Sequence, residues 1–167
     1  MIDDSIIHVG PADWRRQRTI RLRALADAPA AFAGTLAAEQ QLTEADWQAR
    51  LEREHAAMFM AVSSEGADLG LAVGAPYGTV AGLYAMWVAP EARGKGVGGR
   101  LVDAVIDWAT RLGHAAVRLD VGHYNLPAIA LYESRGFVAT GVTGTLPPPR
   151  DAITEFQMER GLIAGAS

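Results

Sequence analysis

Apolar residues follow two different spacings in the N-terminal half of the chain. Around residues 13–26, and again from Thr43, they recur as on the buried face of an amphipathic helix. The second segment opens with Thr43-Glu44-Ala45-Asp46, a capping-box pattern. Extended apolar runs lie at residues 5–9 (SIIHV) and between residues 57 and 89 (AMFMAVSS, DLGLAVG and GTVAGLYAMWVA). The short turns between the last three runs favour antiparallel pairing of the strands that they predict.

The C-terminal half alternates helix-like and strand-like segments. A helix ending at Leu112 carries Leu101, Val105 and Leu112 on one apolar face, and Gly113 suits the left-handed turn that closes it. The strand-like run AAVRLDV follows, and then the helix LPAIALYESR, which Asn125 can cap. Two final strands are predicted by the runs GFVATGVTG and AITEFQMER, which TLPPPRD joins.

This order of elements predicts a mixed α/β fold. A strand meander followed by strand, helix, strand, helix and strand gives one central, mixed and mostly antiparallel sheet between helices on both faces, a three-layer α/β/α arrangement. With 167 residues and no internal repeat, the chain is expected to form a single domain over residues 1–160, followed by a frayed tail at residues 161–167.

Composition narrows the classes of function. The chain is 50% hydrophobic with a formal net charge of −4, values typical of a globular protein that disfavour a nucleic-acid partner. The arginines of residues 13–26 are therefore interpreted as a solvated helix face. The absence of cysteine excludes disulfides and thiol chemistry, and the histidines lack metal-ligand spacing, so no metal is expected.

No targeting or membrane segment is evident in the sequence. The first residues lack the basic start and apolar core of a signal peptide. The longest apolar runs, of about ten residues, fall short of the roughly 20 that a membrane-spanning helix needs. We therefore expect a cytoplasmic protein without a membrane partner.

Residues 94–99, Gly-Lys-Gly-Val-Gly-Gly, join an apolar run to an amphipathic helix. They match the dinucleotide-binding pattern G-x-G-x-x-G, and Asp120 ends the next predicted strand. Residues 90–93 separate the glycines from the strand, and the preceding strands are antiparallel, which disfavours that interpretation. A Walker A loop is excluded because no Lys-Ser/Thr pair follows. The glycines, the helix N-terminus and the charges of Arg93 and Lys95 still predict a cradle for a phosphate group.

Two motifs resemble the signatures of the GNAT superfamily of N-acetyltransferases. The first is Arg93-x-x-Gly96-x-Gly98 after the run LYAMWVAPEA, and the second is NLPAIALYESRGF at residues 125–137. The resemblance is close over about residues 79–137. It implies a sheet splayed at an acetyl-CoA site, acetyl-CoA as cosubstrate, and transfer of the acetyl group to a primary amine of a small molecule or peptide.

The same resemblance implies roles for individual residues. Strands ending at Val88 and Val121 would grip the pantetheine arm, and the Val88 N–H would polarise the thioester carbonyl. Asn125 would cap its helix or contact the cofactor, and Tyr132 would act as general acid to the CoA thiolate. The expected cofactor-binding residues are Met86, Trp87, Val88, Arg93, Gly94, Lys95, Gly96, Val97, Gly98, Asn125 and Tyr132.

The general base and the acceptor stay open. Many family members carry a glutamate where this chain has Gly82, so the base is either another residue or water. The acceptor would lie between residues 29–40 and the last hairpin, TGTLPPPRDAITEF, whose composition does not separate a polyamine, an antibiotic, an amino acid or a protein N-terminus. The residues expected on this side are Phe32, Glu39, His123 and Glu155, and the last three are the candidate bases.

Two alternatives to an acetyltransferase remain at this stage. Gly82, standing where a base is often found, would suit a catalytically weak acyl-CoA-binding module on the same fold. The glycine pattern would suit a dinucleotide-binding domain. In any of these proteins, exposed late strands would offer an edge for a homodimer.

Overall fold

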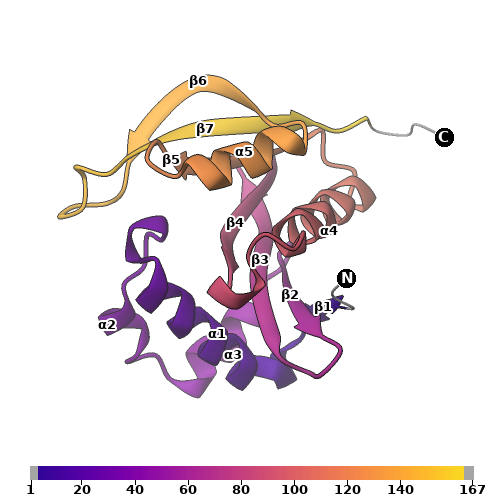
Figure 1. Cartoon of the computed structure of the whole chain (residues 1–167), viewed down its shortest axis with the longest axis vertical. Coiled ribbons are helices and arrows are strands. Elements are labelled where there is room, and N and C mark those ends of the chain that lie inside the picture. The colour runs from indigo at the N-terminus through magenta and orange to yellow at the C-terminus, as the bar shows by residue number, and fades with distance from the viewer. Residues whose placement is uncertain (1–3, 164–167) are drawn as a thin grey trace.

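One seven-stranded sheet organises the molecule (Figure 1). The structure, a computed structural model, describes residues 4–163. The strands are β1 (Asp4–Val9), β2 (Ala57–Ser63), β3 (Asp68–Tyr77), β4 (Val80–Val88), β5 (Ala116–Gly122), β6 (Val138–Thr145) and β7 (Thr154–Gly161). They lie in the order β1-β2-β3-β4-β5-β7-β6, and only β4 and β5 are parallel neighbours. A dinucleotide-binding domain would need a mostly parallel sheet, so this alternative is not supported.

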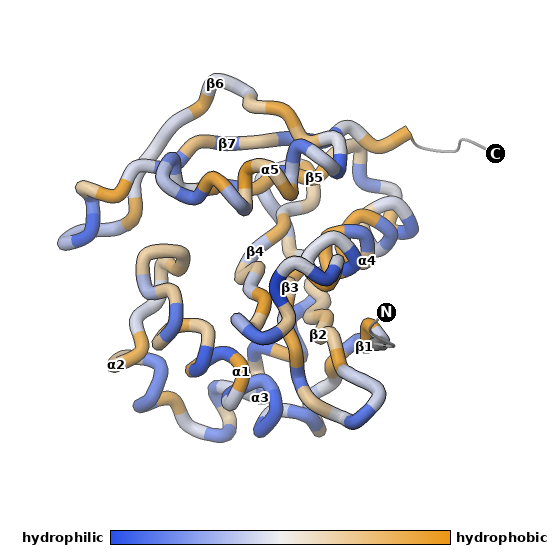
Figure 2. Tube along the Cα trace, in the orientation of Figure 1, coloured by the Kyte–Doolittle hydropathy of each residue, from blue (hydrophilic) through white to orange (hydrophobic). Residues whose placement is uncertain are grey.

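Helices cover both faces of the sheet, as the sequence predicts. They are α1 (Trp14–Asp27), α2 (Leu36–Glu39), α3 (Glu44–Leu51), α4 (Val97–Arg111) and α5 (Leu126–Ser134), with 3-10 turns at Pro11–Asp13, Pro29–Ala31 and Pro90–Ala92. Along β2, Phe59 packs in the cluster that contains the apolar face of α4, whereas Met58 and Met60 pack in the cluster that contains α1. Hydrophilic residues recur along α1 and α3 (Figure 2). Side chains that alternate along the strands thus fill two cores, one on each face.

Each helix and strand expected from the sequence is present, and two predicted caps are formed. The Thr43 hydroxyl accepts a hydrogen bond from the Asp46 N–H (3.2 Å), and the Asp46 carboxylate accepts one from the Thr43 N–H (2.8 Å), which completes the capping box of α3. The Asn125 side chain accepts a hydrogen bond from the Ala128 N–H (3.3 Å) at the start of α5. Capping therefore accounts for at least part of the role of Asn125.

The ends of two elements differ from the sequence prediction. The Leu112 side chain is 53% exposed and caps the C-terminal end of α4, which stops at Arg111, so its place on the buried apolar face was predicted wrongly. At the C-terminus, β7 continues through Gly161, and the Leu162 N–H donates to the Ala115 carbonyl (2.8 Å). Of the tail predicted at residues 161–167, residues 164–167 lie outside the described residues.

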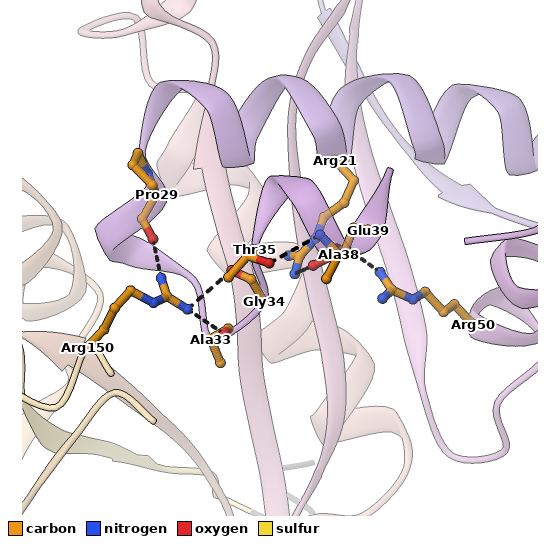
Figure 3. A network of polar contacts seen from close by, with 9 residues as sticks. All are labelled: Arg21, Pro29, Ala33, Gly34, Thr35, Ala38, Glu39, Arg50 and Arg150. Atoms are coloured by element: carbon orange, nitrogen blue, oxygen red, sulfur yellow. Dashed lines mark hydrogen bonds and ion pairs between the residues drawn. The ribbon is translucent and has the colours of Figure 1, made fainter. Parts of the chain in front are cut away.

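A buried ion network ties α1, α2 and α3 together (Figure 3). Glu39, only 4% exposed, accepts hydrogen bonds from Arg21 (2.9 and 3.0 Å) and Arg50 (2.7 Å). Burial alone would raise the pKa of the Glu39 carboxyl, but hydrogen bonds from the two guanidinium groups outweigh it and hold the pKa below its ordinary value. The Arg21 side chain is 14% exposed, so the prediction of a solvated face is wrong for this arginine.

Replacing Glu39 with glutamine is expected to lower the free energy of unfolding by about 3 kcal/mol, because two arginines lose their shared carboxylate. The contribution depends on pH. Since the folded pKa of Glu39 is lowered, its carboxylate stabilises the fold above the unfolded pKa, and this stabilisation is lost as the pH falls through the folded pKa. Urea unfolding near neutral pH and in acid measures both effects. Glu44→Gln, on the exposed surface of α3, is the control, and equal stability of E39Q and wild type near neutral pH would contradict the prediction.

Candidate functional site

The central strands separate to form one side of a large cleft. β4 and β5 pair only at Ala81↔Val117 and Gly82↔Arg118, so their C-terminal parts diverge. A cavity of about 1100 Å³ lies at this splay, lined by both strands, the N-terminal end of α4, α5 and the segment that follows α1. The sequence resemblance implied such a splay, and the sheet confirms it.

A β-bulge in β4 lies beside this cleft. From one paired position to the next, β3 advances by two residues, Leu71 to Val73, while β4 advances by three, Trp87 back to Tyr84. The additional residue is accommodated by Ala85, whose φ of 56° lies in the left-handed region. Strain of this kind at a non-glycine residue persists only where the surrounding structure holds it. Here the paired β3 strand on both sides of the bulge provides that support.

The register after the bulge directs the Val88 backbone toward the cleft. The Ala89 N–H donates to the Leu69 carbonyl (2.8 Å), and Val88 is the Cα partner of Gly70. Because ladder hydrogen bonds alternate along an antiparallel pair, the Val88 N–H points away from β3 and toward the cleft. The neighbouring Trp87 is bonded to β3 by the same alternation. Of the two residues, Val88 is therefore the one placed to contact a bound molecule through its N–H.

The glycine loop presents a row of backbone donors at the other end of the cleft. Gly94 and Gly96 have φ of 75° and 84°, conformations that glycine adopts without steric cost, and the loop leads directly into α4. None of the N–H groups of residues 94–99 donates a hydrogen bond to another described residue. A side chain at Gly98 would crowd Leu131, with 3.0 Å between the added Cβ and Leu131 Cδ2. The loop thus keeps its donors open and its surface flat, as a phosphate cradle requires.

The Arg93 side chain has a structural role that the sequence did not reveal. Its Nε donates to the Val88 carbonyl (3.0 Å) and its Nη2 donates to Asp27 (2.6 Å). Asp27 also accepts from Trp87 Nε1 (3.0 Å), and these bonds, from Trp87 first and Arg93 second, hold the pKa of Asp27 below its ordinary value. The guanidinium therefore fastens the loop to the end of β4 and to α1. An anion at this loop would therefore be held mainly by backbone dipoles.

Tyr132 reaches the cleft from α5. Its side chain is 6% exposed, lines the cavity, and packs edge-on against Phe137 with 5.9 Å between the ring centroids. No described residue forms a hydrogen bond with its hydroxyl group. Burial raises the pKa of Tyr132 well above its ordinary value. The hydroxyl group therefore keeps its proton at neutral pH and is available to donate it.

Two carboxylates line the cleft at the β5–β7 side. The Tyr77 hydroxyl donates to Asp120 (3.0 Å to each oxygen) and accepts from Gln157 Nε2 (3.0 Å). Glu155 lies on the same face of the sheet, where it is the Cα partner of Gly122. Partial burial, and then the negative charge of Asp120, raise the pKa of Glu155. Glu155 is thus the carboxylate in this cleft whose proton affinity is increased.

Packing explains why position 82 carries no side chain. A Cβ on Gly82 would lie 2.6 Å from the Tyr84 ring and 2.9 Å from Tyr77 Cβ. The Tyr84 hydroxyl donates to the Pro76 carbonyl (2.8 Å), which holds its ring over Gly82. The space that a glutamate would need is filled by an aromatic ring, so position 82 supplies no base in this chain.

Arg150 joins the β6–β7 loop to the segment that follows α1 (Figure 3). Its guanidinium donates to the carbonyls of Pro29 (2.7 Å), Ala33 (2.5 Å) and Gly34 (3.4 Å). Phe32, within the clamped segment, is 4% exposed and lines the cleft. The two segments expected to border the acceptor are therefore in contact and fixed to one another.

For the acceptor that the family resemblance implies, replacing Arg150 with glutamine is expected to raise KM about tenfold, because the lost charge-assisted hydrogen bonds leave residues 29–34 free to move. The free energy of unfolding is expected to change little, since the contacts lie at the surface. Steady-state kinetics at saturating acetyl-CoA measure KM, and Arg111→Gln at the exposed end of α4 is the control. An unchanged KM would show that the clamp does not shape the acceptor site.

Most of the residues expected from the sequence line the cleft, and three do not. The cavity includes Phe32, Met86, Trp87, Val88, Arg93, Gly94, Gly96, Val97, Gly98, Asn125, Tyr132 and Glu155. Lys95 lies outside it and donates to the Glu91 carbonyl (3.1 Å). His123 contacts the Thr154 hydroxyl (3.0 Å), and Glu39 is held in its ion network, so neither lines the cleft.

Sequence reasoning missed Asp27, Asp120 and Arg150 as residues of the site. Asp120 lies near the end of a strand that was expected to border the cofactor, and this position could have marked it as a cleft residue. Asp27 and Arg150 carry no comparable signal, because their partners lie 66 and 121 positions away along the chain.

Membrane and metal sites were also sought in the described part of the chain. No helix within residues 4–163 combines the length and the apolar character that a membrane-crossing segment needs. Over the same residues, no group of three or more His, Cys, Asp or Glu side chains is arranged to hold a metal ion.

Comparison with other proteins places this geometry in a family. The profile of the acetyltransferase (GNAT) family matches residues 22–137. An uncharacterized N-acetyltransferase of Schizosaccharomyces pombe is 31% identical over 108 residues, which cover 64% of this chain and 66% of the relative. Matches to two bacterial relatives cover 37% and 48% of their lengths, so the chain spans less than two thirds of the curated relatives that it matches.

Solved structures agree with this assignment over nearly the whole chain. A GCN5-related N-acetyltransferase from Kribbella flavida is 29% identical with a TM-score of 0.72, covering 95% of this chain and 98% of that one. A GNAT superfamily phosphinothricin acetyltransferase from Sinorhizobium meliloti, solved in complex with acetyl-CoA, shares the fold at 22% identity with a TM-score of 0.79, covering 98% and 91%. With a splayed sheet, a glycine-loop cradle and a matching family profile, the chain belongs to the acetyltransferase (GNAT) family.

Proposed function

We propose that this protein transfers the acetyl group of acetyl-CoA directly to a primary amine of a small molecule or peptide. The observation that carries the proposal is the cleft at the splay of β4 and β5, which ends at the unpaired N–H groups of residues 94–99. These donors suit a pyrophosphate, and the walls between β4, β5 and α5 suit an extended, largely apolar arm. The acetyl-CoA complex of the similar fold from Sinorhizobium meliloti supports the choice of cosubstrate.

Three groups of this chain would act on the reacting atoms. Bound acetyl-CoA supplies the acetyl thioester. The Val88 N–H would donate to the thioester carbonyl oxygen and stabilise the charge that develops there. Glu155 would accept a proton from the acceptor ammonium, which leaves the neutral amine able to form the new C–N bond. The Tyr132 hydroxyl would give its proton to the sulfur as the C–S bond breaks.

Among the candidate bases, the contacts favour Glu155. Glu39 is buried between two arginines that lower its pKa, so it is a poor proton acceptor. His123 lies outside the cleft beside Thr154 and Phe156. Glu155 lines the cleft, and its raised pKa brings its proton affinity closer to that of a base working near neutral pH. Cytoplasmic location and homodimer formation stay predictions of the sequence.

The proposal is tested by two linked measurements. Acetyl-CoA, but not NAD or FAD, is expected to raise the melting temperature of the protein. Free-thiol release from acetyl-CoA is then followed across polyamines, amino acids, aminoglycosides and peptides, and at least one amine is expected to accelerate it. Binding of acetyl-CoA without amine-dependent thiol release would overturn the proposed enzymatic activity and favour the alternative of a catalytically weak acyl-CoA-binding module.

A further inference from the structure

A second cavity of about 450 Å³ adjoins the acetyl-transfer cleft. It lies between α1, α3 and the sheet, on the face opposite α4, and we call it the arginine chamber. Arg21, Tyr84 and Ala85 line both the chamber and the large cleft. The chamber therefore opens beside the β4 bulge, next to the position at which acetyl transfer is proposed.

The walls of the chamber carry more positive than negative charge. Arg21, Arg50 and Arg53 line it. Arg21 and Arg50 share the single carboxylate of Glu39, so this network keeps an excess of one positive charge. Arg53 forms no hydrogen bond or ion pair with any described residue. In a protein with a net charge of −4, a cavity lined by three arginines and no carboxylate is a local exception.

The inner surface of the chamber supplies a second, independent observation. Gln17 lines it, is only 7% exposed, and keeps its buried Oε1 without a hydrogen-bond partner among the described residues. An unpaired buried acceptor such as this oxygen costs free energy unless a donor group of a ligand or a water molecule bonds to it. The sheet side of the chamber is apolar and is formed by Met58, Leu71 and Val73. These surfaces suit a small molecule with an apolar body and a polar, charged group.

The charges around the acceptor region have opposite signs at its two sides. Asp120 and Glu155 face the cleft from β5 and β7, whereas the arginines face the chamber from α1 and α3. A molecule with an ammonium group at one end and an acid group at the other would be oriented by both sides. A polyamine would place positive charge against the arginines, which is unfavourable.

We propose that the arginine chamber binds the carboxylate of the acceptor, so that the acceptor is a small amino acid or amino-acid-like amine with an apolar body. This inference rests on the proposed N-acetyltransferase function. Arg53 is the open cation for the carboxylate, the unpaired Gln17 Oε1 can accept a hydrogen bond from an N–H of the ligand or from water, and the amine lies toward Glu155 in the cleft. Guanidinium groups suit this role because they donate paired hydrogen bonds to a carboxylate.

The test compares amines that differ only in the acid group. Each carboxylate acceptor, such as 4-aminobutanoate or phenylalanine, is paired with its primary amide, and kcat/KM is measured for both at several pH values. The carboxylate is expected to be preferred at least about tenfold. In Arg53→Gln this acid-to-amide ratio is expected to fall about tenfold, and Arg53→Lys is expected to restore part of it. The ratio in the control Arg111→Gln is expected to equal that of wild type.

A binding measurement keeps this inference separate from the proposed reaction. Calorimetry with 3-phenylpropanoate and its amide, which have no amine to acetylate, reports on the chamber alone. Tighter binding of the acid, weakened in Arg53→Gln, supports the chamber even if no amine is acetylated. Any of four results would overturn the inference. In calorimetry, this is equal binding of acid and amide. In kinetics, it is an acid-to-amide ratio of kcat/KM equal to one, a ratio that does not change in the Arg53 variants, or preferred acetylation of peptides over the amino acids. Acetylation of neutral amines would then still support the proposed function.

Discussion

Replacing Tyr132 with phenylalanine is expected to lower kcat by about 10²–10⁴-fold, the usual contribution of a positioned general acid, while the Kd for acetyl-CoA stays close to that of wild type. The hydroxyl group is the only group removed, and the ring that packs against Phe137 is retained. Burial raises the pKa of Tyr132, so the group is protonated at neutral pH. The same apolar surroundings would raise the basicity of a departing thiolate and so favour transfer of the proton to it.

Two experiments on one preparation test this prediction. Thiol release at saturating acceptor measures kcat, and calorimetry measures the Kd for acetyl-CoA. Tyr124→Phe deletes a hydroxyl group from a tyrosine that is 53% exposed at the cleft, and it controls for a general effect of losing a phenol. A Y132F enzyme with wild-type turnover would remove Tyr132 from the mechanism. Loss of acetyl-CoA binding in parallel with turnover would assign it a binding role instead.

Replacing Glu155 with glutamine is expected to lower kcat/KM for the acceptor by about 10²-fold or more and to remove from the acidic limb of the pH profile the component that titrates with Glu155. The sign follows from the raised pKa of Glu155: a base acts only when deprotonated, so the rate of the wild-type enzyme falls as the pH drops through that raised pKa. Glutamine occupies a similar volume but accepts no proton. The profile of E155Q would therefore follow only the titration of the acceptor amine.

Asp120→Asn provides the matched variant for this prediction. The negative charge of Asp120 is one cause of the raised pKa of Glu155, so its removal is expected to shift the acidic limb of the profile to lower pH. Rates from mildly acidic to alkaline pH at saturating acetyl-CoA measure both variants. If E155Q retained the wild-type acidic limb, Glu155 would not be the base, and deprotonation through water would become the better account.

Local sequence patterns predicted the elements and the motifs that line the proposed cofactor cleft. The cap at Thr43 and the cap at Asn125 involve residues three positions apart, so their contacts are encoded within one helical turn. The glycine loop at residues 94–99 and the helix that carries Tyr132 are each continuous in the chain. Their geometry depends mainly on short-range backbone conformation, such as the left-handed φ of Gly94 and Gly96. A motif of this kind can be identified without knowing the rest of the fold.

The acceptor half of the site could not be predicted in the same way. Glu39 was a candidate base because it lies in the region expected to border the acceptor, yet Arg21 and Arg50 bind its carboxylate in a buried ion network. Arg93 was expected to add charge to the phosphate cradle, yet Asp27 and the Val88 carbonyl bind its guanidinium. Whether a charged side chain is free or paired depends on residues far away in sequence, and propensity and periodicity contain no information about them.

The sequence by itself therefore determined the order of helices and strands, the glycine loop and the family resemblance, because each depends on residues that are neighbours along the chain. Only the tertiary structure decided which polar groups face the cleft. The bulge of β4 directs the Val88 N–H, the pairing of β5 with β7 brings Glu155 near Asp120, and the packing of α1 and α3 on the sheet forms the arginine chamber. These arrangements arise from long-range pairing of strands and helices, whose register no single segment specifies.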